Sequence, residues 1–195
     1  MSKYPWQNSL SRLLRNRRAD LNGSLRLAVI GIGNELNGDD AVGPMVARTL
    51  HEKKTAGAGD HVLVLDAGVV PENITGKLCA FKPGLIVFID AAEMGEAPGT
   101  VRWITMDEID GMSASTHRMP LSMLAKYLTL ELHCDIVLLG IQPASVEMGK
   151  GLSDPVRRIV DLMSDDLCEL LKLDSERQGV FVKKTAVKTS ESVVA

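Results

Sequence analysis

Four aspartates and one histidine are candidates for metal binding or catalysis, because of their side-chain chemistry and their positions in the sequence. Asp39 and Asp40 are adjacent and precede a predicted helix, whereas Asp66 and Asp90 each end a predicted strand. His117 lies in a small, polar segment ahead of another predicted helix. Two carboxylates and one imidazole form a ligand set that leaves coordination positions open and suits a divalent first-row ion. A helix cap or a surface position would explain an aspartate or a histidine equally well.

Short apolar runs predict the strands that position these residues. Three of the runs are continuous and rich in β-branched residues, which is typical of strands covered on both faces. One run alternates more and is expected at an edge of the sheet, namely Val101–Met106. The other predicted strands are Leu25–Ile30, His61–Leu65, Leu85–Ile89 and Ile136–Leu139.

Helical patterns separate the strands. They cover Val42–Lys53, Glu72–Phe81, Leu121–Leu132 and Pro155–Leu173. This alternation predicts an α/β fold, a three-layer sandwich in which a mainly parallel, twisted sheet of about five strands carries helices on both faces.

The same alternation places the candidate residues. Ligands of such sheets bind beyond the carboxyl ends of the strands. Asp66 and Asp90 are therefore expected at the binding cleft. Only one of Asp39 and Asp40 can cap the helix that follows, which leaves the other to point into the cleft.

Composition argues against several classes of function. The formal net charge of −3 gives no overall attraction to nucleic acid or to an anionic membrane, and aromatic residues make up only 4% of the chain. The apolar runs are much shorter than the roughly 20 residues that span a bilayer. The three scattered cysteines, Cys79, Cys134 and Cys168, indicate a reducing compartment rather than a disulfide scaffold. We expect no nucleic-acid partner, no membrane insertion and a cytoplasmic location.

Familiar catalytic and phosphate-binding motifs are missing from the sequence. Gly31-Ile32-Gly33 lacks the third glycine of a dinucleotide fingerprint, because Leu36 stands at that position. There is no Gly-x-Ser-x-Gly elbow, and no cysteine stands in a context that would activate a thiolate.

The two ends of the chain differ from its centre. Residues 1–24 form a basic N-terminal extension, which we expect to be partly helical with Leu10, Leu13 and Leu14 on one face. Residues 174–195 are polar and lysine-rich, which is typical of a mobile tail. We expect the working domain to cover residues 25–173.

Five segments, in order along this domain, resemble the nickel-iron (NiFe) hydrogenase maturation proteases. The histidine and glutamine segments are most similar to the branch that processes the large subunit of the formate-hydrogenlyase hydrogenase. The matching segments are Gly31-Ile32-Gly33-Asn34 with Gly38-Asp39-Asp40-Ala41-Val42-Gly43-Pro44, Asp66-Ala67-Gly68 with Pro71-Glu72-Asn73, Ile89-Asp90-Ala91 with Met94-Gly95 and Pro98-Gly99, Ser115-Thr116-His117-Arg118-Met119-Pro120-Leu121, and Gly140-Ile141-Gln142-Pro143.

The resemblance implies an endopeptidase, aspartic-type or metal-assisted, that removes the C-terminal extension of a hydrogenase large-subunit precursor after nickel insertion. It implies that Asp40, Asp90 and His117 contact the metal. The nickel is supplied mainly by the precursor, which is the expected partner of a monomeric protein. No catalytic residue is assigned; Asp66 and Asp39 are candidates for a general base.

Alternatives remain open at this level. Asp66 could fix its loop, Asp39 could cap a helix, and Gln142 could either bind substrate backbone or shape its own loop. The same three metal contacts would serve a non-catalytic chaperone that checks the precursor for nickel. A metal-dependent hydrolase of small peptides is a third interpretation.

Overall fold

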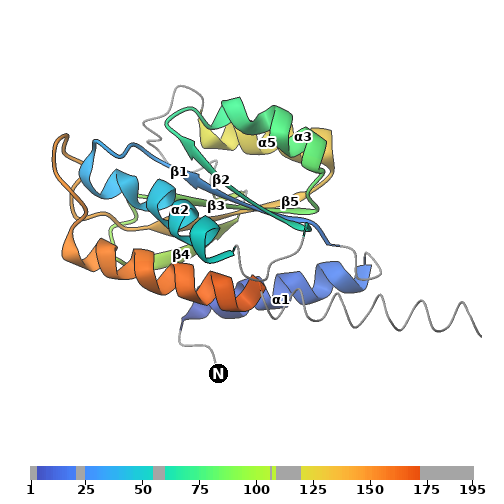
Figure 1. The fold of residues 1–195 in the computed structure, drawn as a ribbon, viewed down its shortest axis with the longest axis horizontal. Helices are drawn as coiled ribbons and strands as arrows, with labels where there is room; N and C mark the ends of the chain where they lie inside the picture. Colours follow the sequence, from blue (N-terminus) through green and yellow to red (C-terminus); the bar gives the residue numbers. More distant parts are fainter. Residues whose placement is uncertain (1–3, 21–24, 55–59, 106, 109–119, 172–195) are drawn as a thin grey trace, which may run out of the picture.

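The computed structural model describes residues 4–20, 25–54, 60–105, 107–108 and 120–171 (Figure 1). Its centre is a five-stranded sheet with the order β2-β1-β3-β5-β4. All neighbouring strands are parallel except β4, which runs antiparallel to β5. The strands are β1 (Leu27–Ile32), β2 (Val62–Gly68), β3 (Leu85–Ala91), β4 (Val101–Thr105) and β5 (Asp135–Ile141).

Helices cover both faces of this sheet, which confirms the predicted three-layer α/β fold (Figure 1). One face carries α1 (Pro5–Asp20), α2 (Val42–Lys54) and the helix of residues 154–171. The other face carries α3 (Thr75–Phe81) and α5 (Leu121–Leu132). Two short 3-10 helices precede α2 and α3, namely η1 (Gly38–Ala41) and η2 (Pro71–Ile74).

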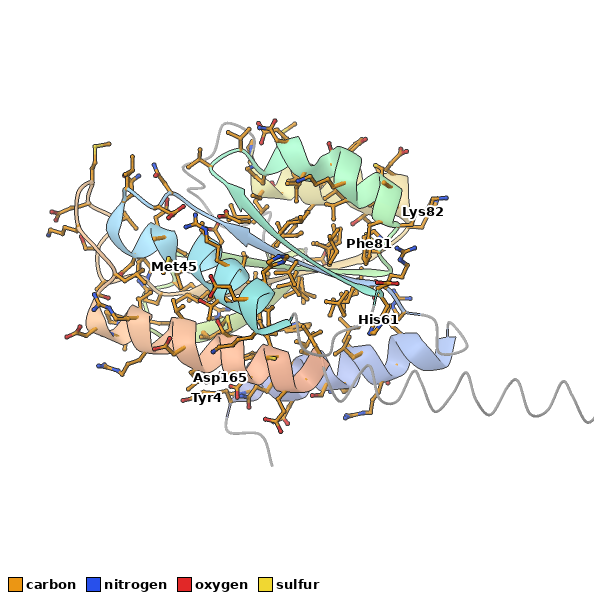
Figure 2. All side chains as sticks on the ribbon, in the orientation of Figure 1. Tyr4, Met45, His61, Phe81, Lys82 and Asp165 are labelled. Carbon is orange, nitrogen blue, oxygen red and sulfur yellow. The ribbon has the colours of Figure 1, made fainter. Side chains whose placement is uncertain are left out.

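Each face of the sheet has its own apolar core. The central strands β1 and β3 are buried along nearly their whole length, and alternate residues enter the two cores. At the amino ends of the strands, Phe81 of α3 packs on the second core (Figure 2). The Arg26 guanidinium lies 4.2 Å from the centre of the Phe81 ring. Edge strand β4 contributes Ile104 to that core. Among the described residues, no helix is both long and apolar enough to cross a bilayer.

Helix α1, the described part of the basic N-terminal extension, is an integral part of the packing. Trp6, Leu10 and Leu14 of α1 are buried in the first core, and Leu13 packs against it. Arg17 of α1 binds the carboxylate of Asp135 at the start of β5. The predicted apolar face of this helix is present, and it packs in the core on one face of the sheet. The division at residues 24 and 173 stays a prediction.

Truncation of a buried residue on α1 is expected to destabilise the whole domain. Leu10→Ala should lower the free energy of unfolding by about 2–5 kcal/mol, because it leaves a cavity in the first core. Arg15→Ala, on the exposed side of the same helix, should change it by less than about 0.5 kcal/mol. Urea unfolding of both variants measures the difference, and equal stabilities would mean that α1 does not belong to the core.

Candidate active site

The loop after β1 brings Asp40 to the carboxyl end of the sheet. Gly33 has φ +142°, and a Cβ at this position would lie 1.8 Å from the carbonyl oxygen of Asp40. Only glycine therefore lets the backbone of Asp40 pack so closely on the end of β1. The backbone N–H of Asn34 donates to Asp40 Oδ2 at 2.9 Å, and Asp40 is only 6% exposed.

Asp90 reaches the same end of the sheet from β3. It lies near the carboxyl end of that strand, opposite Gly140 of β5, and is also 6% exposed. The first turn of α2 lies directly over this point, since a Cβ on Gly43 would lie 2.2 Å from the carbonyl oxygen of Ile32 and 2.3 Å from that of Ile89. The segment that carries Asp40 is thus packed onto the strand end that carries Asp90.

Two buried carboxylates at one end of a parallel sheet can hold a cation. Aspartate is seldom this well buried unless its charge is compensated by hydrogen bonds, an ion pair or a metal. The oxygens of Asp40 and Asp90 are ligands that divalent ions accept. The structure thus places two of the three residues that were predicted to contact the metal at the same end of the sheet, and their role as ligands stays a prediction.

The third predicted contact, His117, lies outside the described residues. Within the described ranges there is no group of three or more histidine, cysteine, aspartate or glutamate side chains that could hold a metal. The role of His117 therefore stays a prediction from the sequence resemblance.

A side chain at Gly43 should separate the two carboxylates. Gly43→Ala places a methyl group against the carbonyl oxygens of Ile32 and Ile89 and should cost about 3 kcal/mol of unfolding free energy. Gly76→Ala is the matched control, because a Cβ there meets nothing within 4 Å and alanine favours the helix by up to about 1 kcal/mol. Thermal unfolding of the two variants tests the close approach, which equal melting temperatures would contradict.

Asp39 anchors a distant loop instead of capping its own helix. Its carboxylate is 1% exposed and accepts hydrogen bonds from Ala144 N at 2.7 Å, Ser145 N at 3.2 Å, Ser153 N at 2.6 Å and Ser153 Oγ at 2.9 Å. Burial opposes its ionisation, but the hydrogen bonds from Ser153, Ala144 and Ser145 outweigh burial and hold the pKa of Asp39 below its usual value. The interpretation of Asp39 as a helix cap is therefore wrong.

Asp66 is held at the outer edge of the site. Its Oδ1 accepts from the backbone N–H of Gly68 at 3.0 Å, and its Oδ2 accepts from Arg48 Nε at 2.8 Å. Arg48 of α2 also binds Glu35 in the loop after β1, with Nη1 2.8 Å from Glu35 Oε2. These contacts favour the loop-fixing role of Asp66 and join α2, β2 and the first loop.

Gln142 shapes the loops at the end of β5. Its side chain is 4% exposed, and both ends of the amide are occupied. Oε1 accepts from Met94 N at 2.7 Å and from Glu96 N at 3.2 Å, while Nε2 donates to Glu93 Oε1 at 2.9 Å and to the Pro143 carbonyl at 3.1 Å. Of its two predicted roles, these bonds favour loop shaping over binding of substrate backbone.

Neither Gly43 nor Arg48 was predicted to be a functional residue. A signal for Gly43 existed, because glycine in the first turn of a helix costs about 1 kcal/mol relative to alanine and so indicates a close backbone approach. Arg48 gave no such signal, since an arginine on a helix is normally exposed to solvent and has no specific partner.

Comparison with known proteins gives a consistent result. The family described as "HycI: Hydrogenase maturation protease" matches residues 44–170, a stretch that includes Asp90 and begins just after Asp40. A Methanocaldococcus jannaschii protein assigned as a hydrogenase maturation protease is 38% identical over 75% of this chain and 89% of its own length. The hydrogenase 3 maturation protease of Escherichia coli K12 is 34% identical over 67% of this chain and 81% of its own length.

The solved structures agree with this match. The crystal structure of the hydrogenase maturation protease HycI from Thermococcus kodakarensis superimposes with a TM-score of 0.70 at 34% identity. The superposition covers 78% of this chain and 99% of the T. kodakarensis protein. The shared part is therefore a whole protein of this class.

Proposed function

This chain belongs to the HycI family of hydrogenase maturation proteases, and from that premise we propose that it cuts the C-terminal extension from a NiFe-hydrogenase large-subunit precursor once nickel has been inserted. It is a hydrogenase maturation endopeptidase, as the resemblance predicted. The single observation that carries the finer proposal is the pair of buried carboxylates, Asp40 and Asp90, at one end of the sheet.

Nickel is part of the substrate in this proposal. The ion arrives on the precursor, and Asp40, Asp90 and His117 provide two oxygens and one nitrogen that can complete its coordination. Binding of the ion then positions the adjacent peptide bond, and an ion in this position can polarise a carbonyl or activate water. A precursor without nickel makes none of these contacts, so its extension is retained.

The remaining aspartates are poor candidates for the general base. Asp39 uses its carboxylate for four hydrogen bonds, which also hold its pKa low and so weaken it as a base. Asp66 is bound to Arg48 and to the Gly68 amide. We assign both residues to positioning of the loops that carry the site.

The same comparisons support a finer proposal on the class of precursor. We assign the chain to the branch that processes the formate-hydrogenlyase hydrogenase, a proposal supported by the 34% identity to the hydrogenase 3 maturation protease of E. coli and by the Gly140-Ile141-Gln142-Pro143 segment. We propose that the protein acts as a monomer in the cytoplasm, and its three free cysteines fit a reducing compartment.

Incubation with purified precursor tests this function. The protein should shorten the nickel-loaded precursor by the mass of its C-terminal extension and leave the nickel-free precursor intact, as read by intact-mass spectrometry. A stable complex with an uncut, nickel-loaded precursor would favour a checkpoint chaperone. Turnover of generic short peptides without any precursor would favour a small-peptide hydrolase.

A further inference from the structure

Three large apolar side chains are exposed beside the candidate active site. Leu36 is 67% exposed in the loop after β1, and Val146 and Met148 are 47% and 78% exposed in the loop after β5. We call these three residues the rim platform. Single exposed apolar residues are common, but a group of them at one functional end of a protein indicates an interaction surface.

Backbone hydrogen bonds join the two loops that carry the rim platform. Gly149 N donates to the Leu36 carbonyl at 2.7 Å, which places Leu36 against the immediate neighbour of Met148. Gly38 N donates to the Lys150 carbonyl at 3.1 Å, and Asp39 N donates to the Ser145 carbonyl at 2.9 Å. Figure 1 shows the loop before α2 and the loop after β5 side by side at the left of the molecule.

Two further features fix these loops in one arrangement. The buried Asp39 carboxylate accepts hydrogen bonds from Ala144, Ser145 and Ser153, at the two ends of the second loop. Gly38 has φ +55°, and a Cβ there would lie 2.5 Å from the Ser145 carbonyl oxygen. The backbone that carries the exposed side chains is therefore held in place before any partner arrives, which lowers the entropic cost of binding one.

The platform is continuous with the carboxylates. Leu36 lies four residues before Asp40 in the same loop, and Asp39, the neighbour of Asp40, holds the loop of Val146 and Met148. A polypeptide whose scissile bond lies over Asp40 and Asp90 must therefore pass close to this surface.

We infer that the rim platform docks an apolar segment of the hydrogenase precursor next to the bond that is cut, an inference that rests on the proposed function. Recognition then has two parts. The carboxylates bind the nickel, and the rim platform contacts apolar side chains of the precursor. The rim platform contacts the precursor equally in the bound substrate and in the transition state. These contacts therefore lower the KM without changing kcat.

Charged substitutions on the platform test this inference. Leu36→Glu and Met148→Glu should each raise the KM for nickel-loaded precursor by about tenfold and leave kcat unchanged, since they remove an apolar contact of the size of one side chain. Leu130→Glu is the matched control, because Leu130 is 76% exposed but lies on α5, away from the site. Its KM should stay within about twofold of the wild-type value.

A parallel binding measurement separates this inference from the function on which it rests. The dissociation constant of precursor should rise about tenfold for Leu36→Glu and Met148→Glu, with circular dichroism confirming that both variants remain folded. Wild-type affinity in both variants, or an equal loss in Leu130→Glu, would overturn the platform. Wild-type protein that binds the precursor without cutting it would overturn the proposed function alone, and failure to bind would overturn both.

Discussion

Asp90→Asn should abolish precursor processing while the protein stays folded. Asparagine has nearly the same size as the aspartate that it replaces at the carboxyl end of β3, but it lacks the charge that would bind the nickel of the precursor. We expect a loss of at least about 100-fold in cleavage rate, the upper range seen when even an indirect support of a metal ligand is removed. Intact-mass measurement of the precursor over time gives the rate, and His117→Ala should lose activity to a similar degree.

Asp66→Asn is the matched control for this loss. Asp66 also lies near the carboxyl end of a parallel strand, but its carboxylate is bound to Arg48 and the Gly68 amide. Cleavage should therefore fall by no more than about threefold, since only the support of one loop is weakened. The site assignment is wrong if Asp90→Asn cleaves at the wild-type rate, and Asp66 is the general base if its variant is the inactive one.

Asp39→Asn should cost more stability than any other single carboxylate change in the described domain. The buried carboxylate accepts three backbone N–H groups and the Ser153 hydroxyl, and an amide can replace only part of this acceptor capacity. Donors that lose their acceptor in a buried site are costly, so we expect a loss of about 3 kcal/mol in unfolding free energy. Urea denaturation measures it.

A second aspartate serves as the control for this effect. Asp161 lies exposed on the helix of residues 154–171, and Asp161→Asn should change the unfolding free energy by less than about 0.5 kcal/mol. Equal stabilities for the two variants would mean that the four hydrogen bonds of Asp39 do not hold the loops together.

The same carboxylate should make the stability depend on pH. The pKa of Asp39 is lower in the folded protein than in the unfolded chain, so its contribution is fully present above the ordinary aspartate pKa of about 3.9. It is lost as the pH falls through the lower, folded pKa. The difference in unfolding free energy between wild type and Asp39→Asn should therefore shrink as the pH is lowered from about 5 to about 2. A difference that stays constant over this range would contradict the assignment.

The elements of this fold were accessible from the sequence because they depend on local periodicity. The pattern of α5 predicted Leu121–Leu132, and the structure has the same bounds. The ends of four predicted strands differ from the observed ends by up to three residues, because ends depend on neighbouring strands that a local pattern does not contain. Asp66 and Asp90 could be placed at one end of the sheet because parallel strands share a direction.

Long-range partners were not accessible in the same way. The pair Asp39-Asp40 suggested one cap and one cleft residue, but the acceptor capacity of Asp39 is used by residues more than 100 positions away. The amphipathic face of α1 was visible in Leu10, Leu13 and Leu14, whereas the surface that it covers was not. A helix pattern states that a face is apolar and contains no information on what buries it.

Crystals of the protein grown with zinc or nickel test directly whether Asp40, Asp90 and His117 bind one metal ion. We expect an anomalous peak within about 2.0–2.2 Å of carboxylate oxygens of both Asp40 and Asp90, with a ring nitrogen of His117 at a similar distance. An ion bound elsewhere, or one that contacts only one of the three side chains, would mean that these residues do not form a single nickel-binding site.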